Sequence, residues 1–241
     1  IKVCRFRSIG TIFTREMKIF VTPTIISSVK KELLFFDVIH LHEYRSFQNI
    51  VVHHFANKYG VPYVIQAHGS LPRIMSKRKL KWIYDAIFGY ELLRNASKVI
   101  ALSQAEAKQY INMGVPKEKI EIVPNGIDLS KYSDLPPKGS FRKKFNIPED
   151  KKIILYLGRI HRNKGIDFLI RAYAYLNKSM NYNDAILVIA GPNDGYLAEA
   201  KRLVNSLKIT NKVMFTGILS EKEKISAYVD STVCTYLNPY E

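Results

Sequence analysis

Long apolar runs and clustered cysteines are both missing from this chain of 241 residues. No segment approaches the ~20 apolar residues that a membrane-spanning helix needs, and no secretory leader pattern opens the chain. The two cysteines, Cys4 and Cys234, lie far apart and form no CxxC pair, which favours a reducing compartment and argues against a metal site. We therefore expect a cytoplasmic globular protein that binds no metal.

Acidic residues are scarce relative to basic ones. The chain has 37 Lys and Arg against 21 Asp and Glu, which gives a formal net charge of +16. The excess is spread evenly, with 19 against 10 up to Asp128 and 18 against 11 beyond it. Nucleic acid, an anionic membrane surface and small polyanions are the partners that such a charge attracts. Because zinc-finger spacing, an aromatic RNA-binding signature and a basic tail are all missing, we expect no nucleic-acid partner.

The apolar residues come in short runs that alternate with helical patterns in both halves of the chain. Strands are expected at 18–22, 37–43, 61–70, 98–103, 120–128, 153–157, 185–191, 212–217 and 232–237. Helices are expected at 25–36, 47–59, 103–114, 165–176, 196–207 and 221–228. This succession predicts βαβ units, and hence an α/β fold of two Rossmann-like domains with parallel sheets, facing each other across a ligand-binding cleft.

A change of composition separates the two halves. Residues 129–150 contain Pro136, Pro137 and Gly139 and show little apolar periodicity, so we interpret them as a linker between domains at 1–128 and 151–241. The chain begins with Ile rather than Met and ends at Glu241, directly after an expected strand. We therefore expect both domains to be incomplete, the first lacking its first strand and the second its C-terminal end.

The sequence IILYLGRIHRNKG over 153–165 is the strongest local candidate for a site. An apolar strand ends at Gly158, a basic loop carries Arg159, Arg162 and Lys164, and a helix can begin at Gly165. Backbone N–H groups at a helix N-terminus attract anions, and the side chains add positive charge. The stretch is neither a P-loop nor GxGxxG. A diphosphate site is one interpretation, and a solvated basic loop is the other.

A second basic stretch is followed at once by aromatic and aliphatic residues. Its cations are Arg73, Lys77, Arg78, Lys79 and Lys81, and its apolar residues are Trp82, Ile83, Tyr84, Ile87, Phe88 and Tyr90. Such a segment over 73–90 is typical of peripheral contact with an anionic membrane. The alternative is an ordinary amphipathic helix with one core face and one solvated basic face.

The order of these motifs resembles the glycosyl transferases group 1 family, which are retaining glycosyltransferases of GT-B fold. The matching segments, from residue 37 to the end, are DVIHLH, VPYVIQAHG, KVIALSQAEA, IEIVPNGID, ILYLGRIHRNKGIDFLIRAYAYL, ILVIAGPNDG, KVMFTG and the last strand with Tyr240 and Glu241. The resemblance implies transfer of a sugar from a nucleotide diphosphate sugar to an acceptor hydroxyl with retention of configuration and without a metal cofactor.

The resemblance also implies roles for individual residues. Arg159 and Lys164 match the basic pair that neutralises the donor diphosphate as the sugar leaves. Glu241 matches the first carboxylate of a two-glutamate motif and would hydrogen-bond the donor sugar. His68 matches a histidine at the reaction centre. The glycines that we expect to bind substrate are Gly69, Gly158, Gly191 and Gly217, the last of them beside the nucleotide base.

The acceptor has no fixed motif. The basic and aromatic segment 73–90 suggests a lipid-linked glycan at the inner face of the cell membrane, and thus a role in polysaccharide or glycolipid biosynthesis. Two departures support an alternative, a non-catalytic nucleotide-sugar-binding or partner subunit: Leu237 and Asn238 stand where the family has Pro-Ser, and the second glutamate would lie beyond Glu241. We expect the 241-residue chain itself to be inactive.

Overall fold

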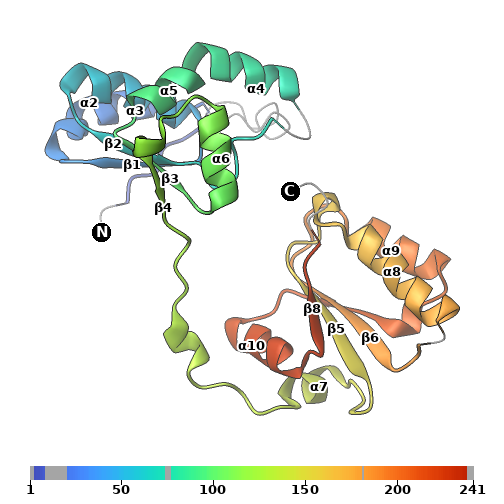
Figure 1. The fold of residues 1–241 in the computed structure, drawn as a ribbon. Coiled ribbons are helices and arrows are strands. Elements are labelled where there is room, and N and C mark those ends of the chain that lie inside the picture. The colour runs from blue at the N-terminus through green and yellow to red at the C-terminus, as the bar shows by residue number, and fades with distance from the viewer. Residues whose placement is uncertain (1–2, 9–20, 74–76, 181, 238–241) are drawn as a thin grey trace. The chain divides into compact units, whose positions relative to one another are not determined.

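The computed structural model of the protein describes residues 3–8, 21–73, 77–180 and 182–237. The chain divides into two compact units, Ile1–Gly126 and Ile127–Glu241 (Figure 1). In the described part, each unit has one sheet of parallel strands, in the orders β1-β2-β3-β4 and β7-β6-β5-β8. The predicted α/β fold with two parallel sheets is confirmed, whereas most of the strand expected at 18–22 lies outside the described residues.

Strands and helices alternate along the first unit. Its described elements are α2 (Thr24–Glu32), β1 (Ile39–His42), α3 (Phe47–Tyr59), β2 (Tyr63–Gln66), α4 (Arg78–Tyr84), α5 (Tyr90–Asn95), β3 (Lys98–Ala101), α6 (Gln104–Asn112) and β4 (Ile120–Ile122). Capping residues define both ends of α3. Ser46 accepts a hydrogen bond from the Asn49 N–H at its start, and Gly60 ends it with a φ of 71°, a conformation that glycine adopts without steric cost.

The centre of the first sheet is buried. Tyr63 and Ile65 of β2 are almost inaccessible to solvent and belong to one apolar cluster that also includes Leu92 of α5. The Tyr63 hydroxyl donates to the Leu92 carbonyl at 2.6 Å. This packing fixes β2, and therefore also the turn that follows it at the carboxyl edge of the sheet.

The second unit has the same alternation of strands and helices. Its described elements are α7 (Ser140–Phe145), β5 (Lys152–Leu157), α8 (Ile166–Ser179), β6 (Ala185–Ala190), α9 (Leu197–Ser206), β7 (Val213–Gly217), α10 (Glu221–Asp230) and β8 (Val233–Thr235). Helices α8 and α9 lie on one side of the sheet, and α7 and α10 lie on the other (Figure 1). Tyr156 of β5 packs in the first of these layers, and Ile153 and Leu155 pack in the second. Burial on both faces explains the uninterrupted apolar run of β5.

The expected linker at 129–150 is partly built into the second unit. After a short 3-10 helix (Leu129–Tyr132), the chain forms α7, whose Phe141 is buried in the core against α10. The Asp230 carboxylate at the end of α10 accepts hydrogen bonds from the Gly139, Phe141 and Arg142 N–H groups. Residues from Gly139 onward are therefore part of the second fold, and the extended linker is shorter than predicted.

Candidate functional site

Three glycines lie together at the carboxyl edge of the second sheet. Gly158 follows β5, Gly191 follows β6, and Gly217 ends β7. The Gly158 N–H donates to the Ala190 carbonyl at 2.9 Å, and the Gly191 N–H donates to the Gly217 carbonyl at 2.8 Å. Gly191 has a φ of 140°, and a Cβ there would lie 1.9 Å from the Gly158 oxygen. The close approach of these two strand ends therefore requires glycine at position 191.

The predicted cations Arg159 and Lys164 lie on the same loop, between β5 and α8. Arg159 Nη1 lies 2.8 Å from Asp194 Oδ2, and 65% of the Arg159 side chain is exposed. Lys164 ends a 3-10 turn (Arg162–Lys164). Its Nζ donates to the Tyr236 hydroxyl at 3.2 Å and lies 5.4 Å from the centre of the Tyr236 ring. The structure thus brings both cations to the carboxyl side of the sheet, and each has a described partner there.

The N-terminus of α8 adds backbone donors to this loop. Gly165, with a φ of 62°, ends the 3-10 turn, and α8 begins at Ile166 with no side-chain cap. Uncapped N–H groups and the helix dipole favour an anion at this position. Asp167 lies in the first turn of α8, so the loop carries carboxylates as well as cations. An incoming anion must compete with the carboxylates for the positive charge.

Tyr156 of β5 holds the loop between β5 and α8 through a hydrogen bond, a role that we did not predict. Its buried hydroxyl donates to the Arg159 carbonyl at 2.9 Å. Burial raises the pKa of Tyr156 to about 12, so this group is a neutral donor. The loops after β5 and β6 also pair, because the Ile160 N–H donates to the Pro192 carbonyl and the Asp194 N–H donates to the Ile160 carbonyl. A tyrosine within an aliphatic strand was the available signal, since a buried hydroxyl needs a partner.

His68 and Gly69 form a tight turn at the carboxyl edge of the first sheet, directly after β2. Their φ angles are 50° and 76°, and the Ser70 N–H donates to the Ala67 carbonyl at 3.1 Å. His68 Nε2 lies 2.8 Å from Nδ1 of His42, the last residue of the neighbouring strand β1. His42 was not among our predicted site residues, because a histidine at a strand end carries no signal of its own.

Glu106 holds this turn from α6. Its buried carboxylate accepts hydrogen bonds from the Gly69 N–H at 2.6 Å and from the Leu102 N–H at 2.7 Å. Ser103 Oγ caps the start of α6 by accepting from the Glu106 N–H, while the carboxylate of Glu106 bonds elsewhere. The local sequence pattern therefore located the start of α6 but concealed the long-range role of Glu106.

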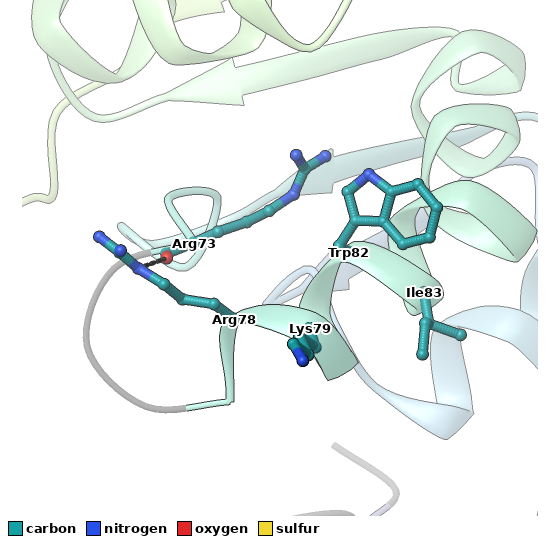
Figure 2. Close-up of a pocket in the computed structure, with 5 residues that line it drawn as sticks. All are labelled: Arg73, Arg78, Lys79, Trp82 and Ile83. Atoms are coloured by element: carbon teal, nitrogen blue, oxygen red, sulfur yellow. Dashed lines mark hydrogen bonds between the residues drawn. The ribbon is translucent and has the colours of Figure 1, made fainter.

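The basic and aromatic segment forms α4, a π-helical turn (Asp85–Gly89) and α5. Arg73, Arg78, Lys79, Trp82 and Ile83 line one hollow on its surface (Figure 2). Trp82 is 58% exposed and Ile83 is 45% exposed. Some apolar residues of the segment are therefore exposed. The alternative of an ordinary amphipathic helix places these residues against the core.

The acidic residue of the segment 73–90 is buried. Asp85 is fully buried, and its Oδ2 lies 2.7 Å from both Arg45 Nη2 and Arg73 Nε. The surface of the segment is consequently apolar and cationic. Among the helices described, none combines the length and apolarity that crossing a membrane requires.

The predicted site residues fall into two groups. His68 and Gly69 belong to the first unit, and Arg159, Lys164 and the three strand-end glycines belong to the second. Glu241 and Asn238 lie outside the described residues. Within the described ranges, no group of three His, Cys, Asp or Glu side chains is arranged to hold a metal ion.

Two Rossmann-like units with a basic loop at one sheet edge define a class of two-domain α/β proteins. Residues 6–131 match the family described as Glycosyltransferase Family 4, and residues 137–241 match Glycosyl transferases group 1. The chain belongs to this glycosyltransferase family, and the resemblance seen in the sequence is confirmed.

Relatives cover different shares of the chain. An uncharacterized glycosyltransferase of Methanocaldococcus jannaschii is 28% identical over 222 residues, which are 86% of this chain and 53% of the relative. The D-inositol 3-phosphate glycosyltransferase of Kineococcus radiotolerans is 26% identical over 145 residues, 57% of this chain and 33% of the relative. The chain thus spans about half the length of these relatives or less.

The fold has solved counterparts. Anabaena HepE, crystallised in complex with UDP and glucose, is similar with a TM-score of 0.70 and 18% identity, covering 97% of this chain and 60% of HepE. At this level of identity the likeness shows the shared GT-B fold.

Proposed function

We propose that the whole protein transfers a sugar from a nucleotide diphosphate sugar to an acceptor hydroxyl with retention of configuration. The observation that carries the proposal is the carboxyl edge of the second sheet, where Arg159, Lys164 and the N-terminus of α8 share one loop. Bond cleavage at the sugar leaves negative charge on the diphosphate. Donors that are already oriented toward that charge lower the barrier, because they need no reorganisation during the reaction.

The other predicted residues have supporting roles in this proposal. Gly158, Gly191 and Gly217 leave the strand ends without side chains, so a nucleotide can approach the backbone. Glu241 hydrogen-bonds the donor sugar, and His68 with Gly69 contacts the reacting groups from the first unit. Since Arg159 and Lys164 supply the positive charge, the reaction in this proposal requires no metal ion.

Titration of the chain with UDP tests the donor site. UDP is the first nucleotide to use because HepE was crystallised with it. Lys164→Ala removes one charged hydrogen bond of about 1.5–3 kcal/mol, so the Kd for UDP should rise roughly 10- to 100-fold. Lys178→Ala is the control, because it removes the same charge from the exposed far end of α8. Equal affinities for the two variants would remove Lys164 from the site.

Turnover separates the enzyme from the alternative of a non-catalytic nucleotide-sugar-binding or partner subunit, which the departures at Leu237 and Asn238 favour. The whole protein is incubated with UDP-glucose, and released UDP is measured with and without candidate acceptors. Release of UDP supports the transferase, and binding without release supports the binding subunit.

We further propose that the segment 73–90 contacts the anionic inner face of the cell membrane, where a lipid-linked glycan would be the acceptor. Trp82 and Ile87 are 58% and 59% exposed, and Arg78 and Lys79 line the same hollow as Trp82 (Figure 2). Exposed rings suit the headgroup boundary, and the cations suit anionic lipid. This arrangement supports a polysaccharide or glycolipid product made on the cytoplasmic side.

Co-sedimentation with vesicles tests the membrane contact. The chain should bind vesicles of phosphatidylglycerol and phosphatidylcholine at low salt, and Trp82→Ala should weaken binding several-fold. Phe168→Ala is the control, because Phe168 is 57% exposed on α8 of the second unit. Binding that is unaffected by Trp82→Ala, or equal binding to neutral vesicles, would contradict the proposal.

A further inference from the structure

His42 and His68 form a ring pair at the carboxyl edge of the first sheet. His42 is the last residue of β1, and His68 follows the neighbouring strand β2. The two strand ends lie side by side, because His42 pairs with Gln66, the last residue of β2. His42 Nδ1 lies 2.8 Å from His68 Nε2, and the rings lie nearly parallel, with centroids 5.1 Å apart and an interplanar angle of 16°. One ring must donate the proton of this bond and the other must accept it.

The main chain at His68 is held independently of the ring. Glu106 accepts from the Gly69 N–H at 2.6 Å and is itself buried and fixed by the Leu102 N–H. Ser70 Oγ donates to the Ala67 carbonyl on the other side of the turn. These contacts keep His68 in a left-handed conformation, with a φ of 50°, that non-glycine residues seldom adopt. With its Cα fixed in this way, the orientation of the His68 ring depends on its own side-chain torsions.

The contact with His42 selects one of those ring orientations. Because Nε2 of His68 is engaged by His42, Nδ1 is the nitrogen left for a further partner. In the described part of the chain, no hydrogen bond to His68 Nδ1 is formed. The His40 ring lies beside His42 as well, with the ring centroids 4.2 Å apart and the planes tilted by 31°, and burial together with the His42 and His68 rings lowers the pKa of His40. A neutral His40 adds no charge that would disturb the pair.

We infer that His42 is a positioning residue, which fixes the ring orientation of His68 so that Nδ1 is presented to a substrate hydroxyl. This inference rests on the proposed function, in which His68 contacts the reacting groups. A partner bound to one ring nitrogen holds the ring in place and leaves the other nitrogen for the substrate, and this is how partners of active-site histidines commonly act.

Three variants at position 42 distinguish a positioning role of the His42 ring from a role in filling space. His42→Asn places an amide close to where Nδ1 lies, His42→Gln places its amide where Nε2 lies, and His42→Ala removes both. We expect His42→Ala to lower kcat for sugar transfer by about 10- to 100-fold, as for other orienting partners, without changing the Kd for UDP. His42→Asn should recover most of kcat, and His42→Gln should not. Equal kcat for His42→Ala and the unaltered protein, or equal recovery by Asn and Gln, would overturn the inference.

Nitrogen-15 NMR of the imidazoles provides a readout that needs no substrate. In the unaltered chain, Nε2 of His68 should show the shift of a hydrogen-bonded ring nitrogen, and His42→Ala should convert the ring to the averaged signals of a free imidazole. Unchanged His68 signals in that variant would overturn the inference even in a protein without turnover. Failure of the proposed function is recognised separately, by a lack of UDP binding and UDP release in the unaltered protein.

Discussion

Arg159 Nη1 lies 2.8 Å from Asp194 Oδ2, and the two side chains are 65% and 42% exposed. Asp194 belongs to the loop after β6, which is hydrogen-bonded to the Arg159 loop through Ile160. The Asp194 carboxylate is therefore paired with the guanidinium that we expect to bind the donor diphosphate. An exposed pair of this kind contributes about 0–1 kcal/mol to stability, so a doubly charged diphosphate can displace Asp194.

Asp194→Asn should tighten the binding of UDP. The substitution removes the competing charge, and the gain of up to about 1 kcal/mol corresponds to a Kd roughly two- to fivefold lower by titration calorimetry. Asp150→Asn is the control, because it makes the same change in net charge beside Lys151, at the opposite end of β5. Weaker binding in Asp194→Asn would instead show that Asp194 orients Arg159 for the ligand.

Gly191→Ala should destabilise the second unit. A Cβ there would lie 1.9 Å from the Gly158 oxygen and require a positive φ, so the ends of β5 and β6 must separate. We expect a loss of at least about 2 kcal/mol in the free energy of unfolding by urea, followed by far-UV circular dichroism, and weaker UDP binding. Gly195→Ala is the matched control, with a φ of 86° and open space around its Cβ, and should cost about 1 kcal/mol. Similar losses in both variants would show that the Gly158 contact is unimportant.

The fold was predictable because its signals are local. Apolar periodicity located α3 at the residues that the structure shows, and most other elements within a few residues. The strand expected at 120–128 is shorter, ending at Ile122, because Pro124 offers no N–H to a neighbouring strand. The predicted linker was longer than the one in the structure, because α7 is held by a residue far away in the sequence. Asp230, which binds the Phe141 N–H, is 89 residues from it, and local patterns do not reveal such a contact.

Of the candidate site, the sequence predicted only contacts between residues that lie close together along the chain. Arg159 and Lys164 lie within one strand–turn–helix unit, so the sequence predicted that they share a loop, and the family resemblance suggested their role. Their partners come from other loops, since Asp194 is 35 residues from Arg159 and Tyr236 is 72 residues from Lys164. Such pairings depend on strand order, which composition and periodicity do not specify.

Asp230→Ala should destabilise the second unit without affecting the first. The substitution leaves the N–H groups of Gly139, Phe141 and Arg142 without their acceptor, and we expect a loss of about 2 kcal/mol. Far-UV circular dichroism should show the shift, whereas the fluorescence of Trp82, the single tryptophan, should keep its unfolding midpoint.

Two further variants support the Asp230 test. Asp230→Asn keeps one acceptor oxygen and should lose about half as much stability. Glu221→Gln changes an exposed carboxylate at the other end of α10 and should have little effect. An unfolding curve of Asp230→Ala that matches the unaltered protein would show that α7 is held by Phe141 packing alone.

Asp85→Asn should destabilise the first unit. Asp85 is fully buried between Arg45 and Arg73, with Oδ2 2.7 Å from a nitrogen of each. Neutralising the carboxylate leaves two guanidinium groups without their counter-charge, and removing one partner of a buried pair costs about 3–5 kcal/mol. The unfolding midpoint of Trp82 fluorescence should therefore fall, because Trp82 lies one turn from Asp85 on the same helical segment. Glu91→Gln, which changes an exposed carboxylate paired with Arg94, should stay within about 0.5 kcal/mol of the unaltered protein. Should the two variants unfold at the same urea concentration, the buried network would contribute no stability to α4, and the hollow beside Trp82 would be held by apolar packing instead.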